Sequence, residues 1–173
     1  KVVSKLDAGP MIRKISEDLS TQSTTGEMTG LMALKGAELM LEVLEDIAKG
    51  NEITPTIQDE TKVTYANKIN KTEGKLNLDD SPDKLVRKIK AFNPYPGITY
   101  IFRRKIFKIW DAISIHLSPM KNSSPGDLIS IDKKLILVLN HGALELFEVQ
   151  LEGANKISGK EFIKRYSLDN GDT

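Results

Sequence analysis

The feature that most constrains the fold is a series of short apolar stretches between residues 98 and 151, separated by turn-forming residues. Short apolar runs bounded by Gly, Pro, Asp and Asn are typical of β-strands joined by tight turns. They predict a five-strand antiparallel meander. An open sheet of this size would leave its edges exposed, so we expect closure into a small barrel of the OB type. The expected strands are Ile98–Phe102, Lys105–Ile115, Asp127–Ile131, Leu135–Asn140 and Ala143–Leu151.

The N-terminal part has a different pattern, which indicates the end of an α/β domain. Two short strands, at residues 1–6 and 11–15, are predicted on either side of a Gly-Pro break. Thr24 and Glu27 form the T-x-x-E pattern that starts a helix, and apolar residues at helical spacing continue to Gly50. Because an amphipathic helix needs a surface to lie on, we interpret this part as the remnant of a Rossmann-like domain whose earlier strands are missing.

The remaining segments complete an α+β fold class. Ser81 as N-cap, followed by Pro82, predicts a second helix, and Ser158 with Glu161 predicts a short final helix. Residues 53–80 are mostly polar and are predicted to be a linker. We therefore expect a catalytic-domain remnant at 1–52, the linker at 53–80 and an OB-like domain at 81–173.

Charge is distributed unevenly along the chain, although the net charge is only +1. Residues 1–60 contain 6 Lys/Arg and 11 Asp/Glu, whereas residues 84–110 contain 8 Lys/Arg and no acid. Such a stretch is either an ordinary solvated face or a surface that binds a polyanion. The eight cations are Lys84, Arg87, Lys88, Lys90, Arg103, Arg104, Lys105 and Lys108.

The composition excludes several kinds of site. The chain has no cysteine, which removes disulfides, thiolate nucleophiles and cysteine-ligated zinc and is typical of a reducing compartment. Its two histidines are far apart and do not have metal-ligand spacing, so we expect no metal. No apolar run approaches the roughly 20 residues of a membrane-spanning helix. Because the first residue is Lys1 and not Met, we expect the natural N-terminus to lie upstream.

Three segments resemble the methionyl-tRNA formyltransferase family. Residues 6–11, Leu-Asp-Ala-Gly-Pro-Met, are similar to the L-D-x-G-x-M corner of enzymes that use 10-formyltetrahydrofolate. Residues 55–69 are similar to the family's linker, and residues 87–97, followed by Lys108-Ile109-Trp110, to its R-A-F-N-P-x-P-G hinge and the next strand. Other formyltransferases share the corner, whereas the hinge and linker point to the branch that acts on initiator tRNA.

The resemblance implies a role in translation initiation, in a cytoplasmic and monomeric protein. The family transfers a formyl group from 10-formyltetrahydrofolate to the α-amine of methionyl initiator tRNA. Asp7 would then assist proton transfer as a catalytic residue, and the eight cations would bind tRNA phosphates. The family's Asn-x-His segment and S-L-L-P folate loop have no counterpart here, so we expect no catalysis by this chain alone. His116 and His141 are interpreted as structural.

Two alternatives belong to other classes. A stand-alone RNA-binding OB module would explain the cations but has no reason to carry the Asp7 corner. A formyltransferase acting on a small amine would share the corner but should lack the density of cations between residues 84 and 108. The aromatic residues Tyr95, Tyr100, Phe102 and Phe107 could stack on unpaired bases, although alternating aromatics in strands usually pack in a core.

Overall fold

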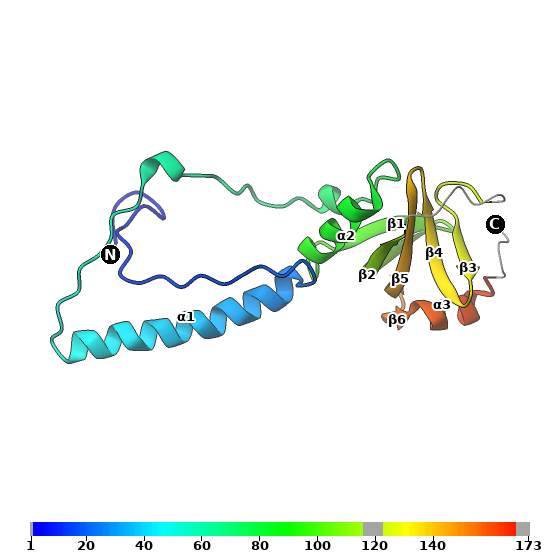
Figure 1. Cartoon of the computed structure of the whole chain (residues 1–173). Helices are drawn as coiled ribbons and strands as arrows, with labels where there is room; N and C mark the ends of the chain where they lie inside the picture. Colours follow the sequence, from blue (N-terminus) through cyan, green and yellow to red (C-terminus); the bar gives the residue numbers. More distant parts are fainter. Residues whose placement is uncertain (1, 116–122, 169–173) are drawn as a thin grey trace. The chain divides into compact units, whose positions relative to one another are not determined.

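A computed structural model describes residues 2–115 and 123–168 of the chain. The chain divides into two compact units, which we call unit 1 (Lys1–Ser20 and Glu27–Lys68) and unit 2 (Thr21–Gly26 and Ile69–Thr173). The segment expected to be a linker therefore contributes to both units. Figure 1 shows the elements of each unit along the sequence.

Unit 1 consists of one long helix and irregular segments. Helix α1 (Thr25–Ala48) confirms the predicted helix, and η1 (Glu60–Lys62) is a short 3₁₀ turn. The strands expected at residues 1–6 and 11–15 are wrong as far as these residues are described: Met11 makes a single antiparallel bridge with Thr56, and the rest is irregular. A strand needs a neighbour for its backbone N–H and C=O groups, and beyond this single bridge neither segment has one among the described residues.

Ion pairs attach α1 to the segment that precedes it. Arg13 pairs with Asp46 and, at 3.7 Å, with Glu42, and Lys35 pairs with Glu17. Arg13 thus offsets acids that oppose the helix dipole at the C-terminal end of α1. Val43 is the one buried residue of the helix.

Unit 2 is built on an antiparallel sheet in the order β1-β2-β5-β4-β3, with β6 paired to β5. Every strand predicted for this unit is found within about a residue of its expected bounds, and both predicted helices begin directly after their predicted caps, Ser81 and Ser158. The elements are η2 (Lys71–Gly74), α2 (Pro82–Ala91), β1 (Ile98–Phe102), β2 (Lys105–Ile115), β3 (Leu128–Ile131), β4 (Lys134–Leu139), β5 (Gly142–Leu151), β6 (Ile157–Ser158) and α3 (Gly159–Tyr166).

The predicted meander is wrong, because β2 pairs with β5 and not with β3. Length explains the pairing: β2 has 11 residues, β5 has 10 and β3 has 4. Only a long partner can bond most of the backbone groups of β2. The ladder shifts register around Asp111, which marks a bulge.

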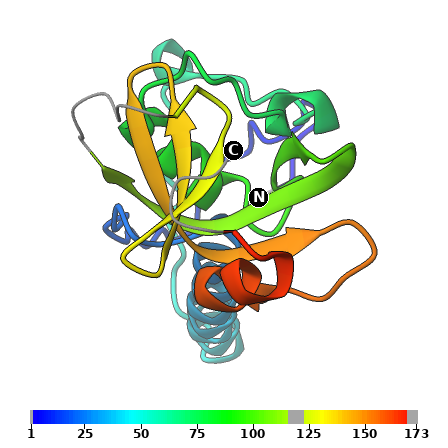
Figure 2. The same cartoon turned by 90° about the vertical axis from the view of Figure 1, so that its right-hand side faces the viewer.

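The core of unit 2 lies between the sheet and its two helices. Leu85 and Ile89 of α2 are buried, and Ser81 caps the helix by accepting a hydrogen bond from the Lys84 amide. Phe162 of α3 is buried against Phe107 of β2, at 5.1 Å between ring centroids. Figure 2 shows the strands curving around this core.

The edge strands of the sheet are linked by a side chain. The hydroxyl of Tyr100, on β1, donates a hydrogen bond to the carbonyl oxygen of Gly126 at 2.8 Å, two residues before β3. Among the described residues no backbone ladder joins β1 to β3. The observed architecture is therefore a small α+β domain with a curved antiparallel sheet. No helix in the described part of the chain has the length and apolarity to cross a membrane.

Candidate functional site

The Asp7 corner is a tight turn that is hydrogen-bonded by a residue about fifty positions later in the chain. Asp7 has a φ of 55°, in the left-handed region that Asp tolerates better than most residues. Gln58 donates hydrogen bonds from Nε2 to the carbonyl oxygens of Asp7 (3.0 Å) and Gly9 (2.7 Å). Met11 and Thr56 exchange two backbone hydrogen bonds of 2.8 Å just beyond. The corner is thus positioned by residues 56–58, which were predicted from the sequence to be part of the linker.

A hollow of about 580 Å³ lies beside this corner, entirely within unit 1. Its lining includes Asp7, Met11, Leu39, Met40, Val43 and Gln58. A carboxylate on a fixed turn beside mostly apolar walls can position an amine or a water and accept a proton from it. The structure thus places the predicted catalytic residue in the lining of a cavity.

Helix α2 carries four of the predicted cations, and three of them are already paired. Asp80, which is 8% exposed, accepts hydrogen bonds from Lys84 (2.6 Å) and Lys88 (3.0 Å). The hydrogen bond from Lys84 is the largest cause that lowers the pKa of Asp80 below its usual 3.8. Lys90 pairs with Asp111 of β2 at 2.7 Å.

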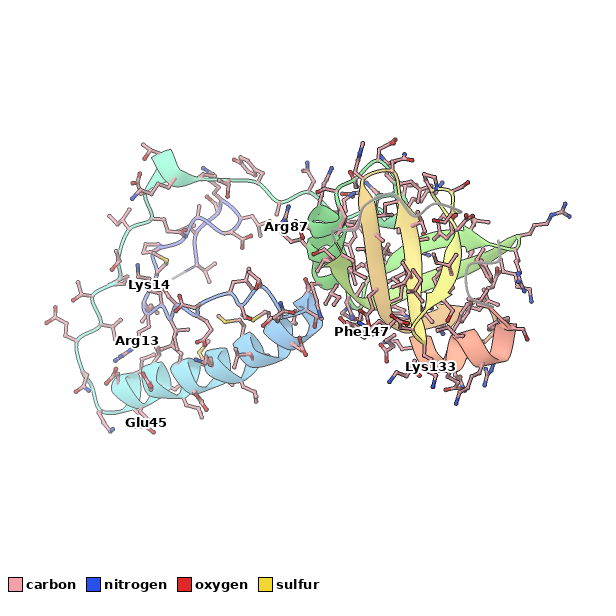
Figure 3. The ribbon with its side chains drawn as sticks, turned by 45° about the vertical axis from the view of Figure 1, so that its right-hand side comes forward. Arg13, Lys14, Glu45, Arg87, Lys133 and Phe147 are labelled. Atoms are coloured by element: carbon pink, nitrogen blue, oxygen red, sulfur yellow. The ribbon has the colours of Figure 1, made fainter. Side chains whose placement is uncertain are left out.

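The other predicted cations have no carboxylate within 4.0 Å among residues 2–115 and 123–168. They are Arg87 on α2, Arg103 and Arg104 in the β1–β2 turn, and Lys105 and Lys108 on β2. The turn lies at the far end of β1 from α2, about 13 Å along a five-residue strand at 3.3 Å per residue. Figure 3 shows Arg87 on one side of unit 2, with the β1–β2 hairpin ending on the other. The eight cations are therefore spread along unit 2, from α2 to the β1–β2 turn and β2.

Several residues of the site were missed by sequence reasoning. Asp80 lies four residues before Lys84 and Asp111 directly follows the cationic window, so a window drawn a few residues wider would have contained both acids. Trp110 has Lys156 at 4.1 Å and Lys108 at 5.3 Å from its ring centroid, and its Nε1 donates to Gln150 at 3.1 Å. Nothing in the sequence signals the contact with residue 156.

The aromatic residues mostly pack in the core, as the sequence pattern favoured. Phe107 is fully buried, Phe102 packs against it at 6.1 Å between ring centroids, and Tyr100 is half-buried. Tyr95 is 53% exposed.

Histidines and acids form no metal-binding group among the described residues, since no cluster of three or more potential ligands is found there. His141 lies in the turn between β4 and β5. His116 lies outside the described residues, so its interpretation as structural stays a prediction.

Comparison with known proteins identifies the family. Residues 68–167 match the family described as "Formyl transferase, C-terminal domain". The chain belongs to this family. Among curated relatives, the methionyl-tRNA formyltransferase of Methylococcus capsulatus is 35% identical over 168 residues, covering 97% of this chain and 54% of that protein. Those of Herminiimonas arsenicoxydans and Bacillus subtilis are 36% and 30% identical, over 95% and 99% of this chain.

The chain spans about half the length of these formyltransferases, with 51–54% of each covered. Solved structures of HypX from Aquifex aeolicus share the fold at 16% identity. One variant covers 97% of this chain and 31% of its own, with a TM-score of 0.70, and a complex with tetrahydrofolic acid has a TM-score of 0.68. The resemblance to the methionyl-tRNA formyltransferase family and the assignment to formyltransferases are thereby confirmed.

Proposed function

We propose that this chain is part of an enzyme that transfers a formyl group from 10-formyltetrahydrofolate to the α-amine of methionyl initiator tRNA. The observation that carries the proposal is the match, over nearly the whole chain, to relatives named methionyl-tRNA formyltransferase. The match extends beyond the C-terminal family domain to include the Asp7 corner. The same proposal implies a monomeric protein that acts in translation initiation in the cytoplasm.

For unit 1 we infer the end of a Rossmann-like domain, supported by the uncovered side of α1. One stripe of this helix is apolar or small and exposed along its length, at the spacing expected for contact with another element. It comprises Gly30, Ala33, Leu34, Ala37, Leu41 and Leu44. The part of the relatives that this chain does not match is about as long as the part that it does match. It is therefore long enough to supply a layer that covers this side of α1. For unit 2 we infer an OB-like barrel, supported by the Tyr100 link between the edge strands.

In the proposed reaction, the α-amine of methionine attacks the formyl carbon and forms a tetrahedral intermediate. Collapse of the intermediate breaks the bond to the folate nitrogen, which takes up a proton as the amine loses one. The carboxylate of Asp7 is suited to carry that proton, because the turn fixes it beside the hollow in unit 1. The groups that stabilise the oxyanion would come from the part of the relatives that this chain does not cover.

Asp7→Asn tests this role with little disturbance to the turn, since Asn also tolerates a positive φ. In a protein that joins this chain to the remaining half of its relatives, we expect formylation to fall by about 10²–10⁴. The matched control is Asp18→Asn, an exposed position in unit 1 outside the lining of the hollow, which should retain activity. Full activity of Asp7→Asn would refute the catalytic role.

The completeness of the site is tested by assaying this chain alone. We expect no formylation without the remaining half, because Asp7 is the one matched catalytic residue of the family pattern. Turnover by the isolated chain would show that other residues of units 1 and 2 suffice.

The cations are proposed to bind tRNA phosphates. Such contacts are blind to sequence and sensitive to salt, because each neutralised phosphate releases counterions. Filter binding of tRNA should therefore weaken steeply between about 50 and 200 mM salt. An affinity that stays constant over this range would argue against a polyanion-binding surface.

A further inference from the structure

The β1–β2 hairpin ends in a turn made of two arginines. Arg103 and Arg104 have φ values of 46° and 63°, between the paired residues Phe102 and Lys105. Positive φ at both central residues is the pattern of a type I′ turn, which favours Asn-Gly. A side chain in the left-handed region costs roughly 1–2 kcal/mol per residue, so this turn gives up stability. The chain keeps this backbone strain although Asn-Gly would adopt the same turn with less strain, and strain of this kind often marks a functional position.

The β3–β4 hairpin provides an internal comparison. Its turn, Asp132-Lys133, has φ values of 50° and 63°, so the two turns share their backbone conformation. It combines an acid with a base, however, and the following Lys134 pairs with Glu145 at 3.0 Å. Charge, and not conformation, distinguishes the β1–β2 turn.

One arginine side chain of the turn, that of Arg103, lies over an aromatic ring. The guanidinium carbon of Arg103 lies 5.0 Å from the centroid of the Phe102 ring. Phe102 in turn packs against the buried Phe107 and Phe162, at 6.1 and 5.7 Å between centroids. A guanidinium that already lies over an aromatic ring loses less rotamer freedom when it binds a ligand.

The outward face of the hairpin continues from the turn along β1 and β2. Ile101 and Ile106 are partners across the strands and are 61% and 41% exposed. Lys108 lies two residues beyond Ile106 and therefore on the same face. Its cation lies 5.3 Å from the ring of Trp110. The face thus has cations at both ends of an apolar pair.

We propose that the β1–β2 hairpin from Ile101 to Lys108, with Arg103 and Arg104 at its tip, is the main phosphate contact for the RNA substrate. Helix α2 is not, because Asp80 and Asp111 already pair with all three of its lysines. This proposal rests on the proposed function, which supplies tRNA as the RNA. Arginine binds phosphate through two parallel hydrogen bonds, and the exposed isoleucines can lie against riboses between phosphates.

The test uses the substitution pair Arg103→Asn/Arg104→Gly, which removes two cations and installs the sequence that a type I′ turn favours. Filter binding of unacylated tRNA should weaken by about tenfold at low salt, with a salt slope smaller by roughly 1.8. The thermal midpoint should rise at the same time. Opposite movement of stability and affinity separates a lost contact from misfolding. The matched control, Asp132→Asn/Lys133→Gly, makes the same turn sequence in the other hairpin and should leave the tRNA affinity unchanged.

Three outcomes would contradict the proposal in distinguishable ways. If the unsubstituted chain binds tRNA and Arg103→Asn/Arg104→Gly binds it equally well, the hairpin role is overturned and the proposed function stands. If the unsubstituted chain binds no tRNA at any salt concentration, the tRNA part of the proposed function fails first. If the substitution abolishes binding to phosphatidylserine vesicles and leaves tRNA binding intact, the hairpin is a lipid contact.

Discussion

In unit 2, Leu137 and Leu144 are fully buried between the sheet and its helices, whereas in unit 1 Leu34 and Leu41 of α1 are 69% and 61% exposed. Both units contain regular elements that carry apolar residues at regular spacing. In unit 2 the apolar faces of neighbouring elements cover one another, but among the described residues nothing covers the corresponding side of α1. An apolar pattern thus specifies which face of an element is buried, and only the partner element turns that face into a core.

Hydrogen exchange on the whole chain gives the largest expected contrast between the units. Backbone amides of β4 and β5 should exchange slowly, through openings close to global unfolding. Amides of α1 should exchange through local fraying, faster by a factor of roughly 10³ or more, because few buried contacts hold the helix. Equal protection of α1 and β5 would mean that the apolar stripe is covered in solution, for example by a second copy.

A pair of leucine truncations should differ next most strongly. Leu144→Ala removes a fully buried side chain from β5, and we expect the free energy of unfolding to fall by about 2–5 kcal/mol. Leu34→Ala, on the exposed side of α1, should change it by less than about 0.5 kcal/mol. Urea unfolding of both variants measures the difference. Comparable losses for the two would show that α1 contributes to a shared core.

The elements of unit 2 could be predicted from sequence because their signals are local. Ser81 and Ser158 cap their helices as expected, and the turns at 103–104 and 132–133 separate strands that match within about a residue. Pairing of β2 with β5 could not be read in this way, because it depends on matching lengths across more than twenty residues. The prediction of the N-terminal strands failed for a related reason: beyond the bridge between Met11 and Thr56, these segments have no neighbouring strand among the described residues.

The residues of the candidate site could be predicted from the sequence better than the contacts that they make. Resemblance to a family identified the corner at Asp7, but the clamp by Gln58 depends on a fold that brings positions 51 residues apart into contact. The eight cations were counted correctly from the sequence. Their arrangement could not be predicted, because Asp80 and Asp111 bind three of them and the length of β1 separates Arg87 on α2 from the turn at Arg103 and Arg104.

An acid titration tests whether the charges of Lys84 and Lys88 are paired within unit 2, by Asp80. The hydrogen bond from Lys84 and, less strongly, that from Lys88 lower the pKa of Asp80 in the folded state below its usual 3.8. The resulting stabilisation is complete above the usual pKa and is lost as the pH falls through the lowered, folded-state pKa. Asp80→Asn should therefore be less stable at neutral pH and should lose less stability on acidification. Urea unfolding at several pH values measures this, with Asp132→Asn in the exposed β3–β4 turn as control. An unchanged acid profile would mean that Lys84 and Lys88 are free to bind other anions.

The smallest expected effect concerns the hydrogen bond from Tyr100 to Gly126, which links the edge strands of unit 2. The described residues of unit 1 form no such sheet. Tyr100→Phe removes the hydroxyl that donates to Gly126 and should lower the free energy of unfolding by about 1 kcal/mol at neutral pH. Burial, with a smaller contribution from the charge of Asp127, raises the pKa of Tyr100 above 10.0. The unfolded chain therefore releases this proton first, and stability declines as the pH rises from about 10 through the raised pKa. The phenylalanine variant should lack this alkaline decline, which unfolding curves at alkaline pH would reveal. If its alkaline profile matches that of the tyrosine protein, the hydroxyl is not held at Gly126 in solution, and the sheet curves without this link.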